Sequence, residues 1–137
     1  MDLSNAARTT AGTLLLTLLA VEFGGLFVLA VVRGRIPQTP FQLAFARAGH
    51  AHAGVLVTLS LVVQMLADAT ALANPWAAVA RSGIPLAAIL MPAGFFLASA
   101  GPGRTTPNRF IALLYVGGAA LAAGAATLGI GLFLAPS

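Results

Sequence analysis

The sequence contains no cysteine and no lysine, and only three of its 137 residues are acidic, namely Asp2, Glu22 and Asp68. The absence of cysteine excludes disulfides, thiolate metal sites and palmitoylation. The formal net charge of +4 arises from seven arginines set against few acids rather than from a basic patch, so it argues against nucleic-acid binding. The sequence also lacks serine, histidine and aspartate in the order of a catalytic triad, a glycine-rich phosphate loop and paired carboxylates. These absences argue against an ordinary enzyme.

Charged residues make up only 7% of the chain and apolar residues 59%, with a mean hydropathy of +0.97. This composition supplies too little polar surface to cover a soluble globule, and it indicates an integral membrane protein. Apolar runs long enough for a hydrocarbon core about 30 Å thick occur four times. We therefore expect an all-α fold, a single transmembrane domain over residues 1–137 that forms a four-helix bundle of two helical hairpins. The expected helices cover approximately residues 9–33, 40–72, 84–100 and 108–134.

A Thr-Pro pair stands before the second and before the fourth expected helix. Thr39, Pro40 and Gln42 match a capping box, with threonine at N-cap, proline at N1 and glutamine at N3. Thr106 and Pro107 are expected to begin the fourth helix in the same way, which hints at a duplication of two hairpins.

Small residues follow one another at helical spacing in the fourth expected helix: Gly118, Ala122, Ala125 and Gly129. Such a stripe lets helix backbones approach closely in lipid. We expect this face to pack against another helix or, in a larger complex, to dock a partner.

The arginines are distributed unevenly between the two ends of the expected bundle. One end carries five of them, whereas the other carries only Arg8 and Arg81. By the positive-inside rule, loops 33–47 and 101–109 face the cytoplasm and both termini lie outside, in a multi-pass protein of the cell membrane. The five are Arg33, Arg35, Arg47, Arg104 and Arg109.

Both histidines lie in the second expected helix, at a depth where an ionisable group is a functional candidate by default. On a regular helix His52 is rotated about 200° from His50, so the two rings point to opposite sides and cannot share one metal ion. Glu22 lies about 16 Å from the end of the first helix, at a depth similar to that of the histidines. We therefore expect Glu22 to contact one of them.

Two runs of residues carry resemblances to known families. The run Arg-Ala-Gly-His-Ala-His-Ala-Gly-Val-Leu at 47–56 and the run Pro-Ala-Gly-Phe-Phe-Leu at 92–97 resemble an uncharacterised family of small four-helix membrane proteins. The His-x-His pair also resembles the corresponding helix of the catalytic subunits of haem-copper oxidases and nitric oxide reductases. That resemblance implies imidazoles that face opposite ways, each towards a separate haem iron. The chain lacks the other histidine-bearing helices of that superfamily, which argues against oxygen reduction.

Carried over to this chain, the oxidase resemblance implies His50 and His52 as ligands of haem b, or of copper or another transition metal. The sixth position of an iron then falls to Met65, to Met91, to a second copy of the protein, or to no group at all.

Other residues around the histidines can support a cofactor. Glycines leave room for a flat macrocycle, arginines pair with its propionates, and polar groups orient an imidazole or carry protons. The same residues also have structural interpretations, because histidines often hydrogen-bond neighbouring helices, methionines fill cores, arginines anchor interfaces and glycines allow helix contacts. The candidates are Gly49 and Gly54, then Arg33, Arg35 and Arg47, and finally Glu22, Gln64 and Asp68.

Three functions follow as hypotheses. The first is a small membrane protein that binds haem or a metal and acts in electron transfer, cofactor handling or gas sensing. The second is a proton-coupled transporter or channel subunit that uses Glu22 and His50 or His52. The third is an assembly subunit of a larger membrane complex. A homo-oligomer or a partner membrane protein within the lipid bilayer is compatible with all three.

Overall fold

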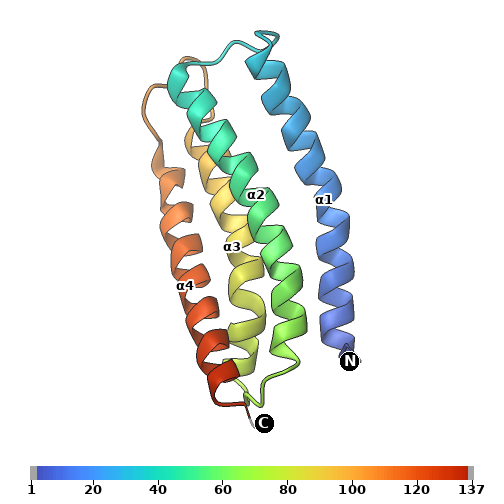
Figure 1. Ribbon diagram of the computed structural model, residues 1–137. Helices are drawn as coiled ribbons and strands as arrows, with labels where there is room; N and C mark the ends of the chain where they lie inside the picture. Colours follow the sequence, from blue (N-terminus) through green and yellow to red (C-terminus); the bar gives the residue numbers. More distant parts are fainter. Residues whose placement is uncertain (1–2, 136–137) are drawn as a thin grey trace.

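Four long helices run side by side with alternating direction in the computed structural model, which describes residues 3–135 (Figure 1). Every regular element within the described residues is helical, which confirms the expected all-α class. The elements are α1 (Asn5–Val32), α2 (Pro40–Ala67), α3 (Trp76–Ala98), the short 3-10 helix η1 (Arg109–Ile111) and α4 (Ala112–Phe133).

The helices pack in chain order, and α1 is the peripheral one. Helix α3 packs along α2 on one side and along α4 on the other, whereas the backbone of α1 approaches that of α2 and no other helix (Figure 1). Buried apolar side chains form two clusters, one joining α1, α2 and α3 and the other joining α2, α3 and α4. The first centres on Leu14, Leu56 and Val57, and the second on Val63, Ile84 and Leu128.

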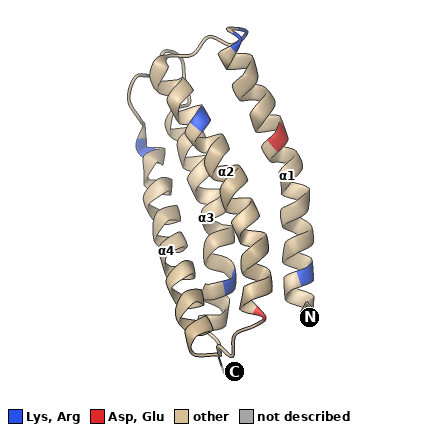
Figure 2. Cartoon of the chain, viewed as in Figure 1, with Lys and Arg blue, Asp and Glu red and all other residues tan. Residues whose placement is uncertain are grey.

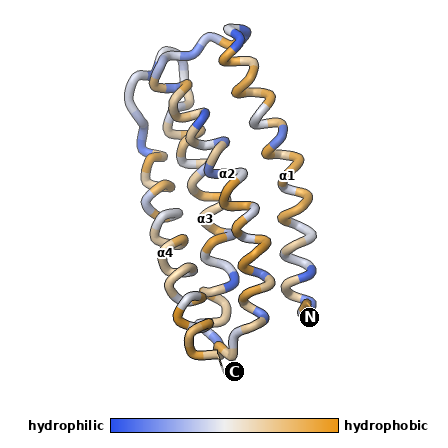
Figure 3. Tube along the Cα trace, in the orientation of Figure 1, coloured by the Kyte–Doolittle hydropathy of each residue, from blue (hydrophilic) through white to orange (hydrophobic). Residues whose placement is uncertain are grey.

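All four helices are long and apolar enough to cross a membrane. Large apolar side chains are exposed along their outer faces, for example Phe23, Tyr115 and Phe133, and apolar residues follow each helix for most of its length (Figure 3). Exposed apolar surface of this kind suits a lipid environment rather than water. The fold is therefore consistent with a multi-pass membrane protein.

The predicted capping box at the start of α2 is confirmed. The Thr39 side chain accepts a hydrogen bond from the Gln42 N–H, and the Gln42 side chain accepts one from the Thr39 N–H. Two of the orphan donors at this helix end are therefore satisfied by local residues.

Thr106 and Pro107 do not begin α4, contrary to the expectation. The side chain of Asn108 instead accepts a hydrogen bond from the Phe110 N–H and starts η1, and α4 proper begins at Ala112. The other bounds also differ: α1 begins at Asn5, α2 ends at Ala67 and α3 begins at Trp76.

The contact between α3 and α4 brings the two backbones together through glycines. A Cβ added at Gly83 would lie 2.6 Å from the Cα of Gly124, and a Cβ added at Gly124 would lie 2.9 Å from the Cα of Gly83. No side chain larger than hydrogen fits between the helices at this crossing. The buried glycines of α4 are Gly117, Gly124 and Gly131.

The stripe from Gly118 to Gly129 does not pack against another helix of the chain, contrary to the first expectation, and its docking to a partner stays a prediction. A Cβ added at Gly118 or at Gly129 would have no neighbour within 4 Å, and Ala122 and Ala125 are exposed. The packed face follows positions seven residues apart, whereas the expected stripe looks outward.

Two glutamines of α2 complete the hydrogen bonding of α3. Pro85 has no N–H to donate to the Arg81 carbonyl one turn earlier. The Nε2 of Gln64 donates to that carbonyl instead, at 3.0 Å. At the other end of α3, the Nε2 of Gln42 donates to the carbonyls of Ser99 and Gly101 at 3.0 and 2.7 Å. Side-chain amides from α2 therefore replace donors that the α3 backbone lacks.

Candidate functional site

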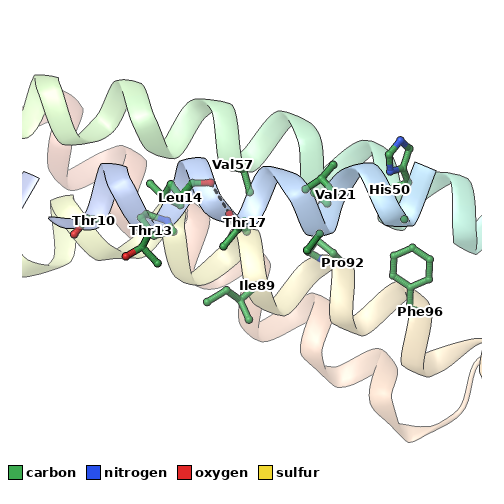
Figure 4. A pocket seen from close by; sticks show the side chains of 15 residues that line it. Thr10, Thr13, Leu14, Thr17, Val21, His50, Val57, Ile89, Pro92 and Phe96 are labelled. Carbon is green, nitrogen blue, oxygen red and sulfur yellow. Dashed lines mark hydrogen bonds between the residues drawn. The ribbon is translucent and has the colours of Figure 1, made fainter. Parts of the chain in front are cut away.

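A groove of about 370 Å³ lies between α1 and α3, with α2 as its floor. Because the backbones of α1 and α3 do not approach each other, the groove opens sideways between these helices. Figure 4 shows His50 and Phe96 at one end and Thr10 and Thr13 at the other. The lining is almost entirely apolar apart from threonine hydroxyls and one imidazole. It comprises Thr10, Thr13, Leu14, Thr17, Ala20, Val21, Gly24, His50, Ala53, Val57, Pro85, Ala88, Ile89, Pro92 and Phe96.

His50 is half-buried against a glycine pair of α1. A Cβ added at Gly25 would lie 3.1 Å from Cε1 and 3.3 Å from Nε2 of the ring, and one added at Gly24 would lie 3.5 Å from Nδ1. Neither ring nitrogen forms a hydrogen bond with any residue that the structure describes. No described polar side-chain atom is sealed away without a partner, so these nitrogens remain accessible. His50 therefore offers an unengaged imidazole at the end of the groove.

His52 points away from α1, as the helical spacing predicts. Its Nδ1 lies 2.8 Å from the Ala48 carbonyl oxygen, and its ring lies 4.8 Å from that of Phe95 at an interplanar angle of 41°. Because a carbonyl only accepts, Nδ1 is the donor in this hydrogen bond. The two histidines therefore occupy different surroundings, one against α1 and one against α3.

Glu22 is exposed, and no hydrogen bond or ion pair within residues 3–135 joins it to a histidine. It lies one turn before Gly25, which contacts His50, so Glu22 and His50 lie within about one helical turn of each other in depth. The expected contact between Glu22 and a histidine is therefore not formed. The similar depth follows from helix lengths, but the direction of Glu22 depends on how α1 is rotated about its axis.

The other candidate cofactor residues lie outside the groove. Arg47 is exposed, and the Gly49 backbone packs against Phe96, where an added Cβ would lie 2.9 Å from the ring. Gly54 faces Val21 of α1. None of the three lines the groove.

Neither methionine proposed as an iron ligand reaches His50. Met65 is exposed and lies 15 residues further along α2, a rise of about 22 Å. Met91 packs against the cluster that joins α1, α2 and α3, and its Cγ would lie 2.6 Å from a Cβ added at Gly117 of α4. The groove therefore supplies one nitrogen ligand and no thioether.

Gln64 and Asp68 belong to a polar network near the C-terminal end of α2, away from the histidines. Asp68 forms an ion pair with Arg81 of α3 and accepts hydrogen bonds from the backbone N–H and the hydroxyl of Ser4, both at 2.9 Å. Gln64 is fully buried beside them. These residues hold α1, α2 and α3 together and do not surround the histidines.

The Asp68 network predicts a dependence of stability on acid. The Ser4 backbone N–H and, next, the Arg81 guanidinium lower the pKa of Asp68 below its ordinary value of 3.8. A carboxyl with a depressed folded-state pKa stabilises the fold above its unfolded pKa, and this contribution is lost as the pH falls through the folded-state value. We expect Asp68→Asn to lower the melting temperature at neutral pH by a few degrees, corresponding to at most about 1 kcal/mol. In thermal unfolding of the detergent-purified protein, the difference from wild type should shrink as the pH falls below the ordinary value of 3.8 and vanish once Asp68 is protonated in the folded state as well. A difference that is constant with pH would contradict the assignment.

Several groove residues are not among the candidates chosen from the sequence. Thr10, Thr13 and Thr17 recur at helical spacing, a signal that was available, whereas the approach of Pro92 and Phe96 depends on tertiary packing. Pro92 has no N–H to donate to the Ala88 carbonyl. Unlike the Arg81 carbonyl, that oxygen receives no side-chain donor from the described residues.

The comparisons with known proteins add no family to this picture. No protein-family model matches the chain, and searches of curated proteins and of solved structures find no match.

Proposed function

We propose that the protein binds a haem b in the groove, with His50 as the axial ligand of the iron. The observation that carries the proposal is the unengaged imidazole of His50 at the end of an apolar groove. A polar group without a partner is unfavourable in apolar surroundings, and coordination would satisfy one of its nitrogens. The groove volume of about 370 Å³ falls in the range of small-molecule sites, and its open side leaves room for a larger flat molecule.

A porphyrin fits these residues better than a bare metal ion does. Within the described residues, no group of three or more His, Cys, Asp or Glu side chains is placed to hold a metal ion. A haem iron already has four porphyrin nitrogens, so the protein needs to supply only axial ligands. One accessible imidazole beside two glycines meets this requirement.

The residues of the chain have separate roles in this proposal. His50 supplies the ligand, Gly24 and Gly25 make room for the imidazole ring itself, and Pro92 and Phe96 form an apolar wall that excludes water. The side opening admits the ligand from the bilayer. When bound, haem supplies one-electron chemistry and axial binding of gases, which suits electron transfer, cofactor handling or gas sensing.

The test is spectroscopic and uses the full chain in detergent with added haem. We expect a Soret band that titrates with the protein, and a haem affinity at least about tenfold lower for His50→Gly because the ligand is lost. Added imidazole should restore the band in that variant, since it can occupy the space left by the side chain. His52→Ala is the matched control and should keep the band, because His52 faces Phe95. The proposal fails if the wild-type protein shows no Soret band, or if His50→Gly binds haem as wild type does.

We also infer that the arginine-rich end of the bundle faces the cytoplasm. The other end carries fewer arginines (Figure 2). One of them, Arg81, forms an ion pair with Asp68. Because the chain has no cysteine, single cysteines report the orientation without background labelling. An impermeant maleimide on intact cells should label Ala71→Cys but not Gln38→Cys, both of which replace exposed loop residues. The reverse labelling pattern would invert the orientation.

A further inference from the structure

We propose that two copies of this chain dock through the exposed α1–α2 face that carries Glu22 and Arg47, so that Glu22 of each copy pairs with Arg47 of the other. The proposal is independent of haem binding. It starts from two charged side chains that stand among apolar residues and have no partner in the described chain.

Glu22 lies in a row of exposed leucines on α1. Four leucines flank it at helical intervals: Leu15 and Leu19 lie seven and three residues before it, and Leu26 and Leu29 lie four and seven residues after it. Their exposed fractions are 54%, 62%, 61% and 42% in that order. Residues at these intervals share one face of a helix. A carboxylate within such a face is unfavourable when it contacts lipid, so a partner that covers the face and supplies a cation would stabilise it.

Arg47 is the matching cation. It lies one turn before His50, as Glu22 lies one turn before Gly25, so both charges flank the contact between His50 and Gly25. Neither residue lines the groove. Within residues 3–135 the ion pair between Arg81 and Asp68 is the only one, so Glu22 and Arg47 do not pair with each other inside one chain.

The two charges lie in the same half of the bundle, where α1 ends and α2 begins (Figure 1). Because α1 and α2 are antiparallel, Glu22 lies one turn to one side of the contact between His50 and Gly25 and Arg47 one turn to the other, so the two differ in depth by about 9 Å. Two copies inserted with the same orientation are related by a two-fold axis along the membrane normal, which keeps every residue at its own depth. The dimer then contains two Glu22–Arg47 pairs, each of which joins one copy to the other. The long aliphatic part of the arginine side chain spans the remaining difference in height.

The shapes of the two helices are also complementary across such an axis. On α2, Ala51 lies four residues after Arg47 and Thr58 lies seven residues after Ala51, and both are exposed. Small residues form a shallow furrow into which the leucine ridge of the other copy can pack. Shape and charge therefore both favour a second copy as the occupant of this face.

The experiment exchanges the charges and measures association in liposomes. Full-length protein is labelled through Gln38→Cys with a donor or an acceptor dye, and energy transfer is followed as the lipid-to-protein ratio rises. Glu22→Arg places arginines opposite arginines, and Arg47→Glu places glutamates opposite glutamates. Each is expected to weaken self-association about tenfold or more. A mixture of the two variants should associate as wild type does. In the mixed dimer the introduced arginine of one copy faces the introduced glutamate of the other, and the remaining native Glu22 and Arg47 form the second pair.

The mixture distinguishes pairing between copies from pairing within a chain, since an intrachain pair would not be restored by mixing. Arg109→Glu, a charge reversal at the same end of the bundle but on η1, is the control and should not change association. Circular dichroism checks that each variant is folded. The proposal is overturned if folded wild-type protein shows no energy transfer above a non-interacting membrane protein. It is also overturned if either single variant associates normally, or if the mixture of folded variants fails to associate.

Discussion

The Gly124→Leu variant is expected to lose the contact between α3 and α4 and to fail to form the bundle. A Cβ at this position would lie 2.9 Å from the Cα of Gly83 and 3.0 Å from the backbone nitrogen of Ile84. Because these neighbours are backbone atoms, no side-chain rotation relieves the overlap, and the helices must separate. We expect a destabilisation of about 3 kcal/mol or more, at or above the upper range for overpacked cores. Thermal unfolding followed by circular dichroism, together with size-exclusion chromatography, measures this loss.

Gly118→Leu is the matched control on the same helix. An added Cβ there has no neighbour within 4 Å, and a leucine on a lipid-facing surface is favourable. This variant should melt close to wild type. If both variants were equally stable, or if Gly118→Leu were the damaging one, the face of α4 that packs against α3 would have been assigned wrongly.

The Gln64→Leu variant should be destabilised by about 2 kcal/mol, because it leaves the carbonyl of Arg81 without a donor. A leucine is close in size to glutamine, so the change removes the amide rather than packing volume. The same thermal unfolding measurement applies here.

Replacement of Pro85 supplies a rescue. In Gln64→Leu combined with Pro85→Ala, the new N–H at position 85 can donate to the Arg81 carbonyl one turn earlier, as in a regular helix. The double variant should therefore regain most of the lost stability, and the coupling between the two sites should exceed about 1 kcal/mol in a double-mutant cycle. Additive effects would show that Gln64 stabilises the fold in another way.

The features that depend on neighbouring residues along the chain could be predicted from the sequence. The number of helices follows from apolar runs, the capping box from three residues within one turn, and the opposite directions of His50 and His52 from helical geometry. These are local properties, so they hold whatever the helix packs against.

The packed face of α4 could not be predicted in this way. Glycine and alanine occur around the whole circumference of this helix, so periodicity alone does not distinguish the face of Gly124 from that of Gly118. The choice is made by Gly83 on α3, which is distant in sequence. A similar long-range partner explains the early start of α3, because Asp68 pairs with Arg81 and allows a charged residue inside an apolar helix.

The candidate site was only partly accessible to sequence reasoning. The histidine stretch identifies His50, but its neighbours depend on which helix approaches and how that helix is rotated. Gly24 and Gly25 face the ring, whereas Glu22, one turn away, faces outward. A rotation of α1 by about 60°, the angular separation of residues three apart, would exchange these positions, and only packing along the whole helix decides it.

The peripheral position of α1 has a consequence for access to the groove. Because its backbone approaches α2 alone, α1 has one neighbouring helix, whereas α3 has two. The Ser4–Asp68 hydrogen bonds hold the first turn of α1, and the short connection to Pro40 holds its last. One long wall of the groove is therefore a helix whose displacement would leave the contacts of α3 with α2 and α4 in place.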